Sequence, residues 1–352
     1  MFNPNRVMST TVFVSGATGF IAQYVIDELL KTEKYKVIGS ARSQEKADKL
    51  LSQFNNSNLS MEIVPNIAEP DAFDHIFAKY AKDIKVVLHT ASPFFFESKD
   101  FDKDLLIPAV NGTSSILKAV KKYAANTVER VVITSSYAAV CTFNEDSQKG
   151  KVINEESWNT MSWEEAKKDG IAAYCASKAF AERFVWEFFE ANKNEIKFKL
   201  STINPVFVFG PQLFDESVAA QLNTSCELIN KVVHSSSDSE IDQTLFGGYI
   251  DVRDVAKAHI CAFEQDDCIG QRLILAEERF TMQTLADIIN QDFPQLRSKI
   301  ATGKPKSDVQ VLSQIATLDN SKSRKLLGFD FIPLKQSVDD TVSQLLKVEG
   351  RL

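Results

Sequence analysis

Short apolar runs alternate with longer amphipathic segments over the first 204 residues, and this alternation strongly constrains the fold. Each run is apolar at successive positions, as strands covered on both faces are. The runs are Thr11–Ser15, Lys36–Ser40, Met61–Val64, Val86–His89, Arg130–Ser135 and Phe198–Asn204. Strands that alternate with helices form a parallel sheet through right-handed crossovers. The sequence therefore predicts an α/β fold with a doubly wound parallel sheet.

Between these runs, apolar residues recur at spacings of three and four, the period of a helix with one buried face. The predicted helices are Phe20–Leu30, Gln44–Gln53, Asp71–Lys79, Leu105–Tyr123 and Ile171–Ala191. After about Pro205 the alternation loosens, and Gly247, Gly248 and a polar stretch at Ser235–Ser239 indicate loops between helices. We expect a smaller, mostly helical lobe there, in which Leu273–Leu275 can form a short strand.

Composition excludes several classes of protein. Lys and Arg number 40 against 47 Asp and Glu, a net charge of −7 and the opposite of a nucleic-acid-binding footprint. No apolar run approaches the about 18 residues of a membrane span, and Met1–Thr10 does not have the pattern of a secretory signal. The 5 cysteines are scattered without a C-x-x-C pair, which argues against a disulfide framework or a zinc site. We therefore expect a cytoplasmic protein with neither nucleic acid nor a membrane as partner.

The first strand runs directly into a glycine-containing turn, Gly16-Ala17-Thr18-Gly19-Phe20-Ile21-Ala22. Gly16 can adopt the tight turn, Gly19 lets the backbone approach a phosphate, and Ala22 lets the helix pack close to the strand. A pyrophosphate would lie at the helix N-terminus, where N–H groups and the positive end of the dipole converge. The spacing differs from the more common G-x-G-x-x-G, and a purely structural turn is the alternative.

The residues after the second strand indicate which dinucleotide is bound. An acidic residue there would bind the ribose 2′-hydroxyl of NAD and repel a 2′-phosphate. This chain has Arg42 directly after the strand and Lys46 one turn into the next helix. A guanidinium binds a phosphate through paired, charge-assisted hydrogen bonds, so the pair predicts NADPH; two solvated surface cations are the alternative. After the third strand, Asn66 is expected either at the adenine or as a turn residue.

These features divide the chain into three expected regions. Residues 1–8 form an N-terminal extension that we expect to be a disordered tail. Residues 9–205 form an NADP-binding domain of the Rossmann type. Residues 206–352 form the smaller lobe, which we expect to bind the substrate and in part to pack back on the sheet.

A candidate proton-transfer group lies in the second half of the Rossmann domain. Tyr174 and Lys178 are four residues apart on a predicted helix, so their side chains share one face. An ammonium nearby, together with an oxidised nicotinamide, would lower the phenol pKa from about 10 toward the working pH. Lys178 can also bind the nicotinamide ribose. Ser135 and Ser136 close the fifth strand at the carboxyl edge of the sheet, where ligands bind. A hydride donor beside such an acid is the requirement of carbonyl reduction.

Together these motifs resemble the extended short-chain dehydrogenases/reductases. Four further segments agree with that family: His89–Pro93, Val110–Thr113, Asn204-Pro205 and Tyr249–Ala256. Within the family the chain is similar to the yeast NADPH-dependent methylglyoxal (isovaleraldehyde) reductases, which are related to plant dihydroflavonol reductases. The segments that carry this similarity are Val37–Lys46, Asp104–Gly112 and Phe246–Ala258.

The resemblance implies a role for each of several residues. Ser136 orients the substrate carbonyl, Tyr174 donates the proton and Lys178 assists it. The implied cofactor contacts are Gly16, Ala17, Thr18, Gly19, Phe20, Ile21, Arg42, Lys46, Asn66, Ile67, Tyr174, Lys178, Pro205, Val208 and Ser225. Asn66 stands where the family often has an aspartate.

Phe94 and Tyr137 flank the proposed carbonyl site and predict an apolar, aromatic substrate pocket. His89, at the end of the fourth strand, is expected to be a core histidine, and no histidine has metal-ligand spacing with the cysteines. The sequence thus predicts an NADPH-dependent reductase of small apolar aldehydes and ketones, without a metal, as a monomer or weak homodimer. Two alternatives share the fold: a nucleotide-sugar epimerase or dehydratase that retains NAD, and a non-catalytic protein that senses NADP.

Overall fold

The computed structural model describes residues 9–92, 100–218 and 222–352. The expected tail at residues 1–8 and the pocket residue Phe94 lie outside the described residues. The chain forms two compact units that alternate along the sequence. The first contains residues up to 142, 156–204 and 256–273, and the second contains residues 143–155, 205–255 and 274–352. A single boundary at residue 205 therefore describes only part of this division.

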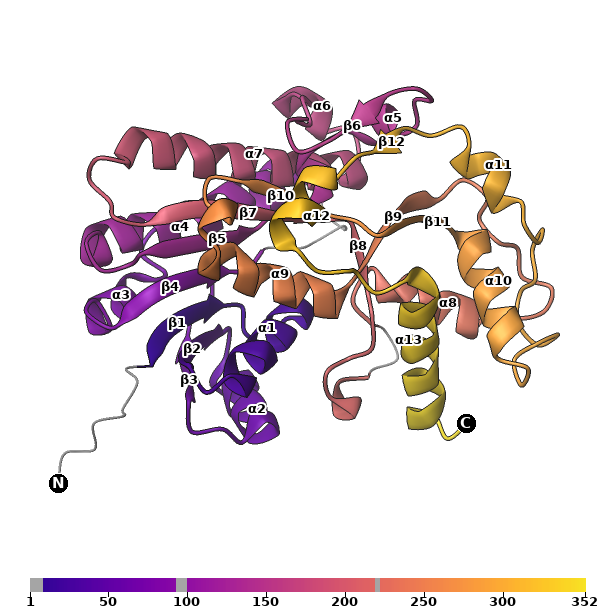
Figure 1. The fold of residues 1–352 in the computed structure, drawn as a ribbon, viewed down its shortest axis with the longest axis horizontal. Helices are drawn as coiled ribbons and strands as arrows, with labels where there is room; N and C mark the ends of the chain where they lie inside the picture. The colour runs from indigo at the N-terminus through magenta and orange to yellow at the C-terminus, as the bar shows by residue number, and fades with distance from the viewer. Residues whose placement is uncertain (1–8, 93–99, 219–221) are drawn as a thin grey trace. The chain divides into compact units, whose positions relative to one another are not determined.

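The first unit is built on a seven-stranded sheet with the order β10-β7-β5-β4-β1-β2-β3 (Figure 1). Its strands are β1 (Thr10–Ser15), β2 (Tyr35–Ala41), β3 (Leu59–Ile63), β4 (Ile84–His89), β5 (Arg130–Thr134), β7 (Lys199–Pro205) and β10 (Arg272–Leu275). All the neighbours from β7 to β3 pair in parallel. Successive strands are added in one direction from β1 to β3 and in the opposite direction from β4 onward. The position between β1 and β4 is therefore the topological switch point, where ligands of such folds bind. The predicted doubly wound sheet is confirmed, and each predicted strand ends within two residues of the observed one.

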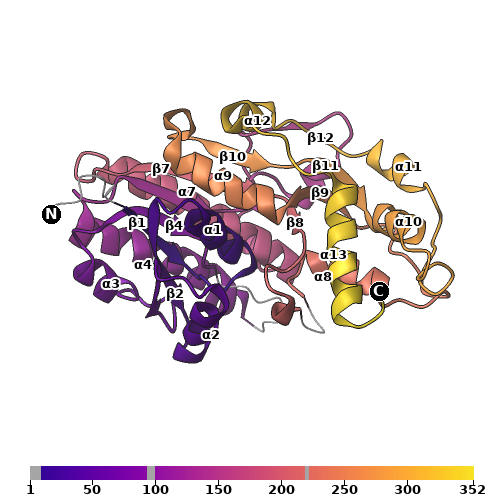
Figure 2. The same cartoon turned by 60° about the horizontal axis from the view of Figure 1, so that its bottom comes forward.

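Helices cover both faces of this sheet. They are α1 (Phe20–Lys31), α2 (Gln44–Phe54), α3 (Asp74–Lys79), α4 (Ile107–Ala124), α7 (Gly170–Asn192) and α9 (Val252–Glu264), with a short α6 (Trp163–Ala166) before α7. In Figures 1 and 2, α3, α4 and α7 lie along one face of the sheet and α1, α2 and α9 along the other. The helix predicted to start at Leu105 instead begins with a π-helical turn, Asp102–Leu106, and continues as α4 with Pro108 in its first turn. Pro108 has no N–H, so it is tolerated only where a helix starts.

Aromatic packing between β1 and α3 forms the centre of the first core. Phe13 lies edge-on to Phe73 and Phe77, with ring centroids 6.1 and 5.5 Å apart. All three rings are fully buried, and α4 and α7 close the cluster through Ile116 and Val185. Burial of each such ring contributes about 2 kcal/mol, so this core holds β1 and the turn that follows it firmly in place.

The second unit combines helices with a small sheet. Its sheet has the order β11-β9-β8, formed by β8 (Phe207–Phe209), β9 (Phe246–Asp251) and β11 (Glu278–Thr281). The helices α8 (Cys226–Val233), α10 (Met282–Asp292) and α13 (Leu334–Val348) pack against one another (Figure 2) and share a core with this sheet. The remaining elements are α5 (Phe143–Asp146), α11 (Asp308–Leu312), α12 (Ser321–Leu327) and a short parallel pair of β6 (Val152–Ile153) and β12 (Thr317–Leu318).

The mostly helical lobe is confirmed, but its sheet was not predicted. Gly247 and Gly248, which indicated a loop, lie inside strand β9. A Cβ on Gly247 would lie 2.7 Å from the Phe207 ring, and one on Gly248 would lie 2.8 Å from Val206. The glycines are therefore required by close packing against these side chains. None of the helices in the described part of the chain is long and apolar enough to cross a membrane.

Candidate active site

The turn between β1 and α1 is shaped for a close backbone approach. Gly16 has φ +66°, and a Cβ there would lie 3.0 Å from the Cα of Ala91. Its N–H donates to the Ser40 Oγ at 3.2 Å, and the Ala17 N–H donates to the Ser40 carbonyl at 2.8 Å. The turn is therefore held against the end of β2, and only glycine suits the left-handed position.

The start of α1 fits a pyrophosphate group. Gly19 is the N-cap, so no side chain caps the helix, and its first turn carries no acidic residue. The first N–H groups of a helix have no partner within the helix. Uncapped N–H groups and the positive end of the helix dipole together make an anion site. This arrangement favours the prediction that the turn binds a dinucleotide over the alternative that it is purely structural.

Two cations flank the start of α2. Ser43 caps this helix, its Oγ accepting the Lys46 N–H at 3.4 Å, and so places Arg42 and Lys46 on either side of the cap. Both side chains are exposed, and neither forms an ion pair with any described residue. No carboxylate ends β2, whose last residues are Ser40 and Ala41. The site therefore suits a 2′-phosphate better than a free 2′-hydroxyl.

Asn66 is engaged within its own turn. Its Nδ2 donates to Glu69 Oε1 at 2.8 Å, and its Oδ1 accepts the Ala68 N–H at 3.0 Å. The next residue, Ile67, packs against the α4 position Gly112, where a Cβ would lie 3.0 Å from its side chain. The contact of Asn66 and Ile67 with an adenine stays a prediction.

The structure brings Ser136, Tyr174 and Lys178 together. Ser136 follows β5 and caps a 3₁₀ helix at Tyr137–Ala139, its Oγ accepting the Ala138 N–H at 3.1 Å. The Tyr174 hydroxyl, on α7, is hydrogen-bonded to the Ser136 side chain. Lys178 lies one helical turn further, with its Nζ 5.5 Å from the centroid of the Tyr174 ring. The serine and tyrosine hydroxyls thus meet at the carboxyl edge of the sheet.

Burial sets the protonation states of this group. It raises the pKa of Tyr174 to about 12, against a smaller lowering by the hydrogen bond to Ser136. It lowers the pKa of Lys178 to about 8. The predicted lowering of the Tyr174 pKa requires an oxidised nicotinamide as well as Lys178, so it stays a prediction. At neutral pH the tyrosine is therefore protonated, which is the form that can act as an acid.

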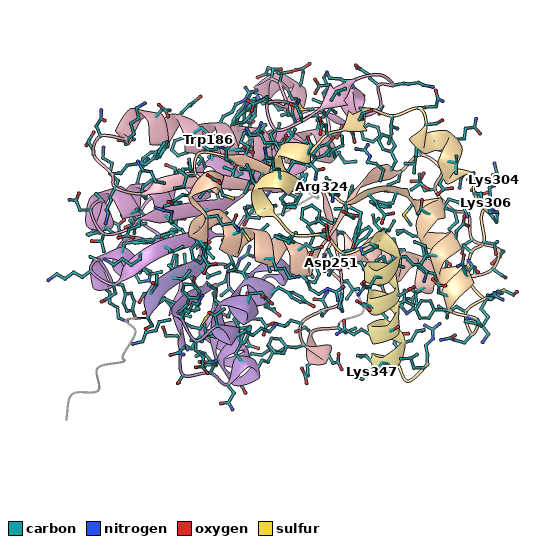
Figure 3. The ribbon with its side chains drawn as sticks, in the orientation of Figure 1. Trp186, Asp251, Lys304, Lys306, Arg324 and Lys347 are labelled. Atoms are coloured by element: carbon teal, nitrogen blue, oxygen red, sulfur yellow. The ribbon has the colours of Figure 1, made fainter. Side chains whose placement is uncertain are left out.

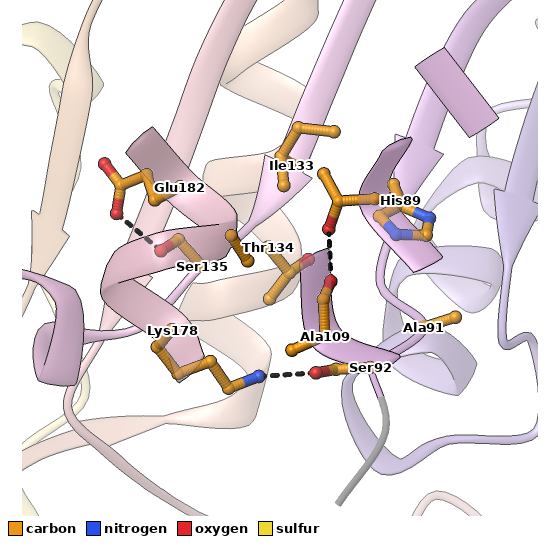
Figure 4. Close-up of a pocket in the computed structure, with 11 residues that line it drawn as sticks. His89, Ala91, Ser92, Ala109, Ile133, Thr134, Ser135, Lys178 and Glu182 are labelled. Carbon is orange, nitrogen blue, oxygen red and sulfur yellow. Dashed lines mark hydrogen bonds between the residues drawn. The ribbon is translucent and has the colours of Figure 1, made fainter. Parts of the chain in front are cut away.

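Lys178 binds a residue that the sequence analysis did not single out. Its Nζ donates to the Ser92 Oγ at 2.7 Å (Figure 4). Ser92 follows β4 as Ser136 follows β5, so both serines lie at the same edge of the sheet. That shared position after neighbouring parallel strands was the signal in the sequence that could have identified Ser92.

His89 and Ser15 support the segment that carries Ser92. The Ser15 Oγ accepts the N–H groups of Thr90 and Ala91, both at 3.1 Å, so its own proton is left to donate to His89 Nδ1 at 2.8 Å. Burial lowers the pKa of His89 to about 3, so the imidazole is neutral and carries its proton on Nε2. His89 is buried as expected, and it lines a cavity of about 20 Å³ beside Ser92 and Lys178 (Figure 4).

The other predicted site residues are placed as follows. Tyr137 is half-buried in the 3₁₀ helix beside Ser136, and its contact with substrate stays a prediction. Pro205, Val208 and Ser225 belong to the second unit, where the Val208 N–H donates to the Ser225 Oγ at 3.2 Å. Within the described ranges, no group of three His, Cys, Asp or Glu side chains could hold a metal ion.

Comparison with known proteins finds relatives over almost the whole chain. The profile of the 3-beta hydroxysteroid dehydrogenase/isomerase family matches residues 13–280. The NADPH-dependent methylglyoxal reductase of Saccharomyces cerevisiae is 59% identical over 343 residues, covering 97% of this chain and 100% of that protein. A putative NADPH-dependent methylglyoxal reductase of Candida albicans is 47% identical over 343 residues, with coverage of 96% and 99%.

A solved structure is similar over the same length. The crystal structure of yeast methylglyoxal/isovaleraldehyde reductase complexed with NADPH superposes with a TM-score of 0.95 and 59% identity. The match covers 97% of this chain and 100% of that one. Because the family profile matches more than half of the chain and these relatives match almost all of it, the chain belongs to the 3-beta hydroxysteroid dehydrogenase/isomerase family of extended short-chain dehydrogenases/reductases.

Proposed function

We propose that this protein reduces small apolar aldehydes and ketones, such as methylglyoxal and isovaleraldehyde, with NADPH as the reductant. It is an NADPH-dependent oxidoreductase. The observation that carries the proposal is the hydrogen bond between Ser136 and Tyr174, with Lys178 one turn away. The names of its close relatives supply the substrate class, since they are described as methylglyoxal and isovaleraldehyde reductases.

Each residue of this group has a proposed task. NADPH, when bound, supplies the hydride that reduces the carbonyl carbon. The hydroxyls of Ser136 and Tyr174 hold the carbonyl oxygen, on which negative charge develops. Tyr174 then gives its proton to this oxygen, so that an alcohol forms and a tyrosinate remains to be reprotonated from solvent. Lys178 is positioned to stabilise that tyrosinate while its ammonium is charged.

The cofactor is proposed to lie along the carboxyl edge of the first unit. The uncapped start of α1 suits the pyrophosphate, and Arg42 and Lys46 suit the 2′-phosphate. Lys178, with Ser92 as its partner, is placed for the nicotinamide ribose. Contacts by Asn66, Ile67, Pro205, Val208 and Ser225 are part of the same proposal.

The substrate pocket is proposed to include Phe94 and Tyr137. Both follow strands that end at the carboxyl edge, one after β4 and the other after β5. Aromatic side chains there favour a small apolar carbonyl compound over a charged nucleotide sugar. The protein is further proposed to act in the cytoplasm as a monomer or weak homodimer. None of its five cysteines, which all lie in the described ranges, forms a disulfide, as is typical of a reducing compartment.

The initial rate of cofactor oxidation tests the proposal. We expect rapid oxidation of NADPH with isovaleraldehyde and with methylglyoxal, and slow oxidation of NADH on the same preparation. Oxidised NAD retained in the purified protein would instead indicate an epimerase or dehydratase. NADPH binding without turnover of any carbonyl compound would indicate a protein that senses the cofactor.

A further inference from the structure

A fully buried carboxylate lies behind the reacting residues and has no task in the scheme above. Glu182 is on α7, one turn beyond Lys178, and its side chain has an exposed fraction of 0%. It forms an ion pair with Arg272 of β10, whose Nε donates to Oε1 at 2.6 Å. Burying two charges costs several kcal/mol per ion unless further hydrogen bonds satisfy them. The other hydrogen-bond partners of Glu182 and Arg272 therefore show which parts of the chain this ion pair keeps in position.

Both oxygens of Glu182 accept several donors. Oε1 accepts from Arg272 and from Trp186 Nε1 at 3.4 Å, and Thr202 Oγ1 lies 3.2 Å from it; Trp186 is labelled in Figure 3. Oε2 accepts the Ser135 hydroxyl at 2.5 Å (Figure 4) and the Asn204 Nδ2 at 2.6 Å. Two of these donors are connected to Ser136: Ser135 precedes it in the chain, and Asn204 also donates to its carbonyl.

Ser136 is anchored through its neighbour and through its own carbonyl. Ser135 precedes it in the chain and is tied by its hydroxyl to Glu182 and by its N–H to the Ile203 carbonyl at 2.7 Å. The Asn204 Nδ2 donates not only to Glu182 but also to the Ser136 carbonyl at 3.2 Å. Its Oδ1 accepts Thr202 Oγ1 at 3.0 Å, which fixes the orientation of the amide. The carboxylate thus holds the peptide groups on which the Ser136 side chain is mounted.

Arg272 holds the other end of the same segment. Its Nη2 donates to the carbonyl of Ala139, the last residue of the 3₁₀ helix that Ser136 caps, at 3.5 Å. Its Nη1 donates to the Ser157 carbonyl at 2.5 Å, and its guanidinium lies 3.7 Å from the centroid of the Trp158 ring. One buried ion pair therefore contacts both ends of residues 135–139.

We propose that the Glu182–Arg272 pair is a positioning device for Ser136, acting through Ser135 and Asn204. This inference rests on the proposed function, because it assigns Ser136 the task of holding the substrate oxygen. We assign the pair a positioning role and no contact with the reacting atoms, because both oxygens of Glu182 are occupied by donors of the protein. It sets where the Ser136 hydroxyl lies relative to Tyr174, and an error of about 1 Å in such a position costs on the order of 100-fold in rate.

The arrangement needs a carboxylate because both oxygens must accept. A glutamine at this position has one oxygen and one NH₂ group. With the oxygen toward Arg272, the NH₂ faces the Asn204 Nδ2, and two donors confront each other. Asn204 relieves this only by turning its amide over, which presents Oδ1 to the glutamine and removes the donor from the Ser136 carbonyl. Glu182→Gln therefore releases Ser136 while almost preserving the volume of the side chain.

The test compares Glu182→Gln and Asn204→Ala with a matched control. Each variant is expected to lower kcat for isovaleraldehyde by about 10- to 100-fold, since the carbonyl is held less well in the transition state. The Kd for NADPH should stay within about twofold of that of the unaltered protein. The double variant should be no slower than Glu182→Gln, because both changes act through the same carbonyl.

Glu155→Gln is the control for a merely structural effect. Glu155 is also buried, at 5% exposure, and accepts the Ser323 hydroxyl at 2.6 Å in the second unit. This variant should lower the melting temperature but leave kcat within about twofold. The proposal is overturned if Asn204→Ala or folded Glu182→Gln retains full kcat, or if Glu155→Gln slows turnover as much. Should Glu182→Gln not fold, Asn204→Ala decides alone.

Turnover by the unaltered protein distinguishes a failure of the proposed function from a failure of the positioning proposal. If it turns over no carbonyl compound with NADPH, the proposed function fails. The positioning of Ser136 is then decided by crystal structures of the unaltered protein and Asn204→Ala. An unmoved Ser136 hydroxyl in the variant refutes the inference, and a displaced one supports it.

Discussion

Loss of the Lys178 charge should make the reaction slower as the pH rises through about 8. Burial lowers the pKa of Lys178 to about 8 and raises that of Tyr174 to about 12. Lys178 is thus charged below pH 8 and neutral above it, while Tyr174 stays protonated throughout. Between pH 7 and pH 9 the charged fraction of the lysine falls from about nine-tenths to about one-tenth. We therefore expect kcat/KM for NADPH to fall about tenfold over this range.

The assay is the pH profile of kcat/KM for NADPH at saturating isovaleraldehyde, which reports the ionisations of the free enzyme. Lys178→Arg retains a positive charge at every pH used. Its profile should be level from pH 7 to pH 9, at whatever absolute rate the longer side chain permits. Lys31→Met, which removes an exposed lysine of α1, should keep the fall near pH 8. A fall that persists unchanged in Lys178→Arg, or an unaltered protein whose profile stays level to pH 10, would refute the reasoning.

Three further substitutions test the rest of the site. Tyr174→Phe should lower kcat by about 100-fold or more by removing the proton donor, with an unchanged Kd for NADPH in a fluorescence titration; full activity would exclude Tyr174 as the acid. Arg42→Ala should raise KM for NADPH about tenfold but not that for NADH, since a charge-assisted hydrogen bond contributes about 1.5–3 kcal/mol; equal effects on both cofactors would contradict the 2′-phosphate assignment. Gly16→Ala should lower the free energy of unfolding in urea by about 1–2 kcal/mol, because alanine is strained at φ +66° and its Cβ would lie 3.0 Å from Ala91; unchanged stability would show that the turn can relax.

Much of the first unit could be predicted because its signals are local. A strand covered on both faces is apolar at every position, and a helix with one buried face repeats at three and four residues. These periods located β1 to β5, β7 and their helices in the chain. The sheet of the second unit was missed because Gly247 and Gly248 look like a turn in sequence. Glycine is required at these two positions because Phe207 and Val206, 40 or more residues away in the chain, pack closely against them.

In the candidate site, too, the features recognised from the sequence are local, and the missed ones depend on packing between distant residues. Tyr174 and Lys178 share a helix face, and the glycine turn joins consecutive elements, so both could be recognised from spacing. The lowering of the Tyr174 pKa by Lys178 together with an oxidised nicotinamide stays a prediction, whereas burial of the phenol by itself raises this pKa. The depth of burial depends on packing that no local pattern reports. Ser92 was likewise missed as the partner of Lys178, because the two are 86 residues apart.

The sequence by itself determined the parallel sheet, the turn before α1 and the pairing of Tyr174 with Lys178, because each depends on neighbours within one or two elements. Only the tertiary structure decided which charged groups are buried and what they hold. Glu182 and Arg272 are 90 residues apart and look like ordinary surface charges in the sequence. They meet because α7 packs on a sheet whose edge strand, β10, returns from far along the chain. Inside the core an ion pair must find every hydrogen-bond partner nearby, and here those partners include the residues that carry Ser136.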